Sequence, residues 1–137
     1  MNISDATAIK ILPFESAVLD GLVAQKNEDL SPEDISILNE QMKGAIILSR
    51  TMTGVGFYTK FLVDKKAQQL DKKSLQISGV GANISGVEHG AGFILFIKEG
   101  VIDNLEGFTY AEDRWPDPWP SATPLEWSIF EIPNAAA

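Results

Sequence analysis

The only histidine, His89, is the side chain best suited to general acid–base chemistry near neutral pH. It lies in the glycine-rich residues 86–92, which would leave its ring accessible. In a strand, the neighbouring Glu88 would point to the opposite face and would not orient the imidazole. A single histidine in a chain without cysteine also does not supply the several nitrogen and sulfur ligands that are typical of a zinc site. We therefore favour a structural histidine in a turn between two strands over a catalytic base, and we expect no metal site.

The glycines of residues 79–86 do not form a nucleotide-binding loop. Their spacing differs from the dinucleotide fingerprint, and the segment does not end in lysine followed by serine or threonine. No helix is expected after them, so no helix N-terminus is available to hold a phosphate. Bulges and tight bends that curve a sheet explain these glycines better, and we expect no cofactor.

Two carboxylates, Asp103 and Glu106, lie in an apolar stretch that is typical of a strand. Because they are three residues apart, they would face opposite sides of that strand and could not form a paired acid and base. Glu106 is expected to be buried against Arg50, which lies in another predicted strand. A buried ion pair is more often structural than catalytic, although strand-centred pairs also mark functional sites.

The most unusual segment, residues 115–120, contains Trp115 and Trp119 together with three prolines. Prolines fix the backbone and remove amide donors, which predicts a stiff loop. The two rings either seal the end of the sheet or stand exposed as anchors for a partner protein, because tryptophan is enriched at binding hot spots. Neighbouring acids would then supply a polar rim: Glu112, Asp113 and Asp117.

The chain is acidic, with a formal net charge of −8, and this charge is unevenly placed. Residues 99–131 hold eight acids and one base, so they carry seven of the eight net negative charges. Residues 60–73 are instead rich in lysine. An acidic surface repels phosphate backbones, which disfavours nucleic acid as a partner, and it suits a basic protein. Acidity also promotes solubility by itself.

The composition indicates one globular domain. The chain has 137 residues, of which 45% are hydrophobic and 22% charged. We predict a single domain over residues 1–137, with a helical part at 1–44 and a sheet part at 45–132. The absence of cysteine fits a reducing compartment. No apolar run approaches the roughly 20 residues of a membrane helix, and residues 1–10 lack a signal-peptide pattern, so we expect a cytoplasmic protein that binds no membrane.

Two helices are predicted in the first 44 residues. The second begins at the N-cap Ser31, followed by a proline and two acids, and ends near Gly44. Its apolar residues recur at helical spacing: Ile35, Leu38 and Met42. The first helix covers residues 15–26, and Pro13 indicates that residues 9–12 belong to a separate turn of helix or to an extended lead-in. Four of its residues should face inward: Val18, Leu19, Leu22 and Val23.

After Gly44 the pattern changes to short β-branched and aromatic runs separated by turns. Residues 45–52 and 55–63 flank Thr53 and Gly54, which predict a hairpin or a bulged bend. Residues 93–97 form an apolar run typical of a strand that is central or covered on both faces. Further strands are expected at three ranges: 75–87, 101–110 and 125–132. This order predicts an α+β fold, with N-terminal helices packed on one face of a mainly antiparallel, twisted sheet of about five or six strands.

Several short sequence motifs in the predicted sheet part resemble those of a group of small bacterial proteins of unknown function: residues 53–59 (TGVGFYT), 90–96 (GAGFILF), 105–110 (LEGFTY) and 115–116 (WP). The resemblance covers about residues 46–120 and not the N-terminal helices. It implies a bacterial cytoplasmic protein and brings no established activity or functional residues. In size and acidity alone, the chain is also similar to immunity proteins, which neutralise partner toxins.

These features favour a protein-binding module over an enzyme. The leading hypothesis is a small acidic protein, of immunity or inhibitor type, that engages a basic partner through its acidic, tryptophan-bearing C-terminal surface. The alternative is a small-ligand-binding protein or an enzyme with a pocket between helices and sheet, where four residues would converge: Arg50, His89, Glu106 and Tyr110. A third hypothesis is a homodimer in which the lysines of residues 60–73 meet the acidic half of a second copy.

Overall fold

The computed structural model describes residues 10–25, 27–116, 119 and 126–132. Two helices come first: α1 (Pro13–Ala24) and α2 (Pro32–Gly44). Six strands follow: β1 (Ile46–Met52), β2 (Gly56–Leu62), β3 (Ser74–Ile84), β4 (Val87–Lys98), β5 (Val101–Thr109) and β6 (Trp127–Glu131). A short 3-10 turn, η1 (Tyr110–Glu112), comes directly after β5.

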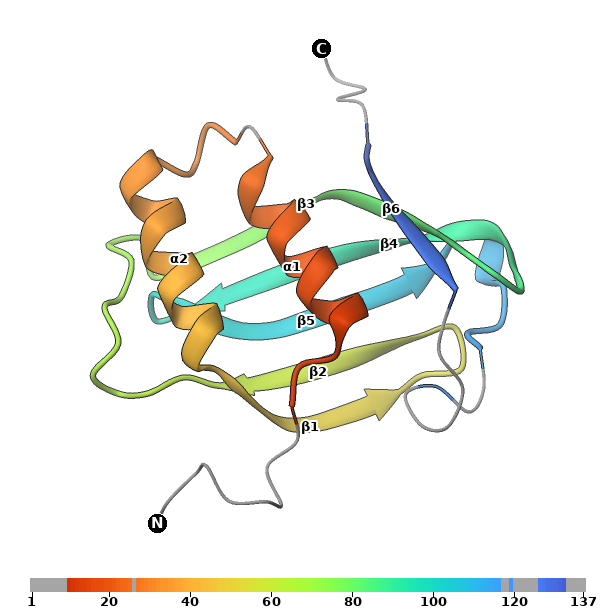
Figure 1. Ribbon diagram of the computed structural model, residues 1–137, viewed down its shortest axis with the longest axis horizontal. Helices are drawn as coiled ribbons and strands as arrows, with labels where there is room; N and C mark the ends of the chain where they lie inside the picture. Colours follow the sequence, from red (N-terminus) through yellow and green to blue (C-terminus); the bar gives the residue numbers. More distant parts are fainter. Residues whose placement is uncertain (1–9, 26, 117–118, 120–125, 133–137) are drawn as a thin grey trace.

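The strands form one antiparallel sheet in the order β1-β2-β5-β4-β3-β6. Both helices lie on the same face of this sheet, side by side (Figure 1), which confirms the predicted α+β architecture. No described helix covers the other face, which we call the open face. Its central side chains form two cross-strand rows: Thr51, Tyr58, Glu106, Ile94 and Ser78; and Ser49, Lys60, Asn104, Phe96 and Gln76.

Helix α1 starts earlier than the sequence predicts. The described lead-in, residues 10–12, is outside the helix and Leu12 is extended, which agrees with the predicted extended lead-in. The predicted start at Glu15 was wrong, because Pro13 itself occupies the first turn, where its missing amide hydrogen breaks no helical bond. The Glu15 carboxylate accepts a hydrogen bond from the Leu12 amide at 2.9 Å and caps the helix start. The predicted inward-facing residues are all buried: Val18, Leu19, Leu22 and Val23.

Helix α2 begins after the N-cap Ser31, as predicted. It is fixed to the sheet by the buried side chain of Gln41. The amide nitrogen of Gln41 donates to the carbonyls of Gln68 and Gly100, at 2.8 and 3.0 Å. Its oxygen accepts from the Ile102 amide at 2.9 Å. A buried amide with both ends bonded in this way holds α2 against the turn between β4 and β5.

Strand β4 lies between β5 and β3, which confirms the central position predicted for residues 93–97. Phe93, Leu95 and Ile97 are buried beneath the helices. Ile94 and Phe96 are only half-buried on the open face, so of the two predicted alternatives the central position is the one that the structure has. The reason is that the two helices reach only one side of the sheet.

Glu15 is a fully buried carboxylate in this core. It accepts hydrogen bonds from Arg50 Nε at 2.9 Å, Arg50 Nη2 at 2.5 Å and the Thr59 hydroxyl at 2.7 Å, besides the helix-capping bond. The network therefore joins the start of α1 to both β1 and β2. A buried charge is tolerated only when it is paired and hydrogen-bonded, and Glu15 meets both conditions.

The predicted pairing of Arg50 with Glu106 was wrong. Arg50 is aligned across the sheet with Thr59, and Thr59 with Leu105, so the Arg50 side chain lies on the helix side. Glu106 is one residue further along β5 and faces the other way. An inward-pointing arginine on the edge strand β1 also discourages another strand from adding to that edge.

We expect Arg50→Met to lower the free energy of unfolding by about 3–5 kcal/mol, because the Glu15 carboxylate would stay buried without its cation. Urea unfolding followed by tryptophan fluorescence measures this change. The control is Lys43→Met, which removes an ion pair to Glu40 between two largely exposed side chains and should cost less than about 1 kcal/mol. Equal effects of the two substitutions would contradict the role assigned to Arg50.

Candidate binding site on the open face

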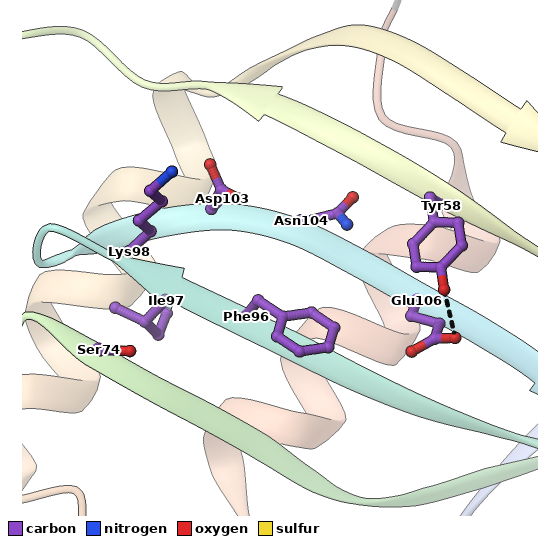
Figure 2. Close-up of a pocket in the computed structure, with 8 residues that line it drawn as sticks. All are labelled: Tyr58, Ser74, Phe96, Ile97, Lys98, Asp103, Asn104 and Glu106. Atoms are coloured by element: carbon purple, nitrogen blue, oxygen red, sulfur yellow. Dashed lines mark hydrogen bonds between the residues drawn. The ribbon is translucent and has the colours of Figure 1, made fainter.

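A hollow of about 410 Å³ lies on the open face, over β2, β5, β4 and the start of β3 (Figure 2). Eight residues line it: Tyr58, Ser74, Phe96, Ile97, Lys98, Asp103, Asn104 and Glu106. It lies on the side of the sheet opposite to the pocket that the sequence predicted between helices and sheet. Glu106 is the one residue of that predicted pocket that lines it.

A β-bulge in β5 brings both carboxylates to this hollow. Phe96 pairs with Asn104 and Ile97 pairs with Ile102, so Asp103 is an extra residue without a partner in β4. The prediction that Asp103 and Glu106 face opposite sides was therefore wrong, because it assumed an unbroken alternation along the strand. Both side chains line the same hollow.

Glu106 lies at the centre of the sheet and is half-buried. The Tyr58 hydroxyl donates a hydrogen bond to Glu106 Oε2 at 2.9 Å, and no described Lys or Arg lies within ion-pair distance of this carboxylate. Figure 2 shows the second carboxylate oxygen on the side of Phe96. The bond to Glu106 and the charge of its carboxylate raise the pKa of the Tyr58 phenol, because both disfavour a phenolate there.

The other charged groups of the hollow lie toward its opposite end (Figure 2). Asp103 is neutralised by Lys60, whose Nζ lies 2.5 Å from its carboxylate. Lys98 is exposed and forms no ion pair with any described residue. Asn104 has a buried side-chain oxygen without a hydrogen-bond partner among the described residues. The hollow thus has unused hydrogen-bonding capacity in the middle and charges of opposite sign at its two ends.

Aromatic rings extend the open face beyond the hollow. Phe108 is aligned with Gly92 in β4, and Phe130 with Gly81 in β3. A Cβ at Gly92 would lie 2.6 Å from the Tyr110 hydroxyl and 2.9 Å from the Phe108 ring, so only glycine permits this close packing. Tyr110 and Phe130 remain 36% and 39% exposed, which leaves an apolar surface beside the charged hollow.

The two tryptophans of the proline-rich segment lie in the core. Trp115 and Trp119 are 2% and 7% exposed, and their ring centroids lie 5.0 and 4.7 Å from that of Phe57. Phe14 of α1 packs against both rings. The tryptophans therefore seal one end of the core, and they are not exposed anchors. Asp117, proposed for the rim around them, lies outside the described residues.

His89 lies within β4 and not in a turn, so that prediction was wrong. Its Nδ1 lies 2.9 and 3.1 Å from the two carboxylate oxygens of Asp113, and its backbone amide donates to Asp113 at 2.7 Å. The hydrogen bond and charge of Asp113 raise the pKa of His89. The bonds from His89, the backbone amide first, lower the pKa of Asp113. Glu112 beside this pair is exposed. The pair fastens the segment after β5 to β4.

The four residues expected to converge in one pocket are separated in the structure. Arg50 is bound to Glu15 beneath the helices, and Glu106 lies in the hollow on the open face. His89 is bound to Asp113, and Tyr110 packs against Phe108. Within the described ranges, no three histidine, aspartate or glutamate side chains come together as metal ligands.

Comparison with known proteins gives no relative: no protein-family model, no curated protein and no solved structure matches this chain. The resemblance to small bacterial proteins therefore stays a prediction. Neither described helix is long and apolar enough to cross a membrane.

The His89–Asp113 pair predicts a defined pH window. Because the pKa of His89 is raised, its contribution to stability is full below the ordinary value of 6.5 and is lost as the pH rises through the raised pKa. Because the pKa of Asp113 is lowered, its contribution is full above the ordinary value of 3.8 and is lost as the pH falls through the lowered pKa. The pair therefore stabilises most between these two ordinary values.

We expect the imidazole of His89, followed by NMR, to titrate with a midpoint above 6.5 in the wild type and closer to 6.5 in Asp113→Asn. His89 is the only histidine, so its signal is unambiguous. Glu88→Gln is the matched control, because its charge is the last of the causes that raise the His89 pKa. A midpoint unchanged by Asp113→Asn would show that the pair does not form in solution.

Proposed function

We propose that this chain is a protein-binding module that engages a basic partner protein through the open face of its sheet. The observation that carries the proposal is Glu106, a half-buried carboxylate without a described cation, in a hollow beside partly exposed aromatic rings. Protein interfaces combine apolar and aromatic contacts at their centre with polar groups around them. The open face offers that combination.

The net charge supports a basic partner in particular. A net charge of −8 attracts a cationic protein over a distance and raises its association rate at low salt. Exposed acids lie along the C-terminal part of the chain: Glu112, Glu126 and Glu131. In this proposal they add to the long-range attraction of a basic partner, while the buried tryptophans contribute to stability and not to contact.

An immunity or inhibitor protein is the concrete form of this proposal, because such proteins bind basic partners through acidic surfaces. The bacterial and cytoplasmic assignments stay predictions, supported by the sequence resemblance and by the absence of cysteine. A second copy of the chain is the competing partner. Its lysine-rich residues 60–73 would have to reach the acidic rim, which makes that self-association sensitive to salt.

The test is partner capture at low salt from the source organism's lysate with three immobilised proteins: wild type, Glu106→Lys and Glu28→Lys. The two variants change the net charge equally, but Glu28 is an exposed loop residue between the helices. We expect a basic protein to be retained by wild type and Glu28→Lys and lost by Glu106→Lys, because only the second variant places a repelling charge on the open face.

Four results would overturn the proposal. If the wild type retains nothing beyond the bare matrix, there is no such partner. Equal loss with both variants would mean that net charge alone matters, and retention by all three would place the contact elsewhere. Light scattering that shows a salt-sensitive dimer of the wild type would identify a second copy as the partner and refute the basic-protein assignment.

A further inference from the structure

We propose that the hollow around Glu106 is a subsite for a guanidinium group, supplied by an arginine side chain of the partner. This inference deepens the proposed function and rests on it. The subsite consists of Glu106, Tyr58, Phe96 and Asn104, which lie together in Figure 2. The described residues leave this site short of hydrogen-bond donors, and a guanidinium group is rich in them.

The carboxylate of Glu106 sets the charge of the ligand. Tyr58 donates its one hydroxyl hydrogen to Oε2, which leaves Oε1 as a free acceptor and leaves the Tyr58 oxygen with acceptor capacity only. A half-buried carboxylate gains most from a charged donor, because charge-assisted hydrogen bonds are roughly twice as strong as neutral ones. The site therefore selects a cation over a neutral or anionic group.

The ring of Phe96 and the amide of Asn104 set the shape of the ligand. Figure 2 shows the Phe96 ring beside the free oxygen of Glu106, so a planar cation held by that oxygen lies next to the ring. Guanidinium groups stack on aromatic rings and present five donors in one plane, whereas an ammonium group is compact and strongly hydrated. The Asn104 side-chain oxygen, buried beside the hollow, has no partner among the described residues and is a further acceptor for a group rich in donors.

The lysines near the hollow do not satisfy Glu106. Lys60 is bound to Asp103, and Lys98 lies at the end of the hollow away from Glu106, with its ammonium on the side of Asp103 in Figure 2. The ammonium of Lys98 repels a cation at its own end and attracts a carbonyl oxygen. An arginine residue placed with its guanidinium at Glu106 and its backbone toward Lys98 matches both ends of the hollow.

The test uses Nα-acetylarginine amide as the probe, added to the isotopically labelled protein and followed by NMR at low salt. We expect saturable binding to the wild type and an affinity about ten- to a hundredfold lower for Glu106→Gln, which keeps an acceptor for Tyr58 but removes the charge. The matched control is Glu28→Gln, which makes the same charge change at an exposed residue in the loop between the helices and should change the affinity less than about twofold. The corresponding lysine derivative should bind more weakly, and the neutral citrulline derivative more weakly still.

A second readout follows the phenol of Tyr58, one of only two tyrosines. A bound guanidinium neutralises Glu106, so the probe should lower the raised pKa of Tyr58 in the wild type and leave it unchanged in Glu106→Gln. Unchanged urea midpoints would confirm that each variant is folded.

Failure of this inference can be separated from failure of the proposed function. Absence of saturable binding, or equal affinity for wild type and Glu106→Gln, overturns the arginine subsite even if a partner is captured through the open face. Glu106-dependent binding of the probe supports the subsite even if capture retains no protein.

Discussion

The buried carboxylate of Glu15 is the constraint on which the arrangement of helices and sheet depends. A charge inside the core needs a cation and several donors, and these come from three separate places: the start of α1, Arg50 in β1 and Thr59 in β2. Only one placement of α1 satisfies all of them. The other end of α1 is held by the Gln25 side chain, which donates to the Ser78 carbonyl in β3. The helix therefore crosses the sheet from one side to the other (Figure 1).

This placement explains why the sheet has one covered face and one open face. Because α1 and α2 lie on the same side, the alternation along each strand directs the other half of its side chains to a surface that neither α1 nor α2 covers. Glu15 and Glu106 show the contrast most clearly. The first has four hydrogen bonds and a cation, whereas the second has one hydrogen bond and no described cation. The unequal treatment of these two carboxylates is the physical basis for assigning binding to the open face.

The sequence predicted the features that depend on local chemistry. The N-cap at Ser31 and the inward stripe of α1 follow from helix geometry and capping, and the hairpin around Thr53 and Gly54 follows from turn preferences. The order of helices and strands was sufficient to predict an α+β fold with helices on one face.

Contacts between distant segments could not be predicted in the same way. Arg50 was assigned to Glu106 because both looked like charges in strands, but the choice between Glu15 and Glu106 depends on strand register. The bulge at Asp103 shifts by one residue the alternation of the β5 side chains between the two faces of the sheet, and no local residue type predicts this bulge. His89 bonds to Asp113, and Trp115 is buried in the core. Predicting either feature requires knowledge of the path that the chain takes after β5, and local residue types do not give that path.

The most direct measurement of the central claim is a map of backbone amide shifts in the labelled protein during titration with a hexaarginine peptide at low salt. Binding to the open face predicts the largest shifts at Tyr58, Phe96 and Glu106, with the amides of Glu15 and Leu19 in α1 unmoved on the other side of the sheet. Shifts confined to exposed acids such as Glu112 and Glu131, or centred on α2, would contradict it. The peptide would then bind through general surface charge and not in the hollow on the sheet.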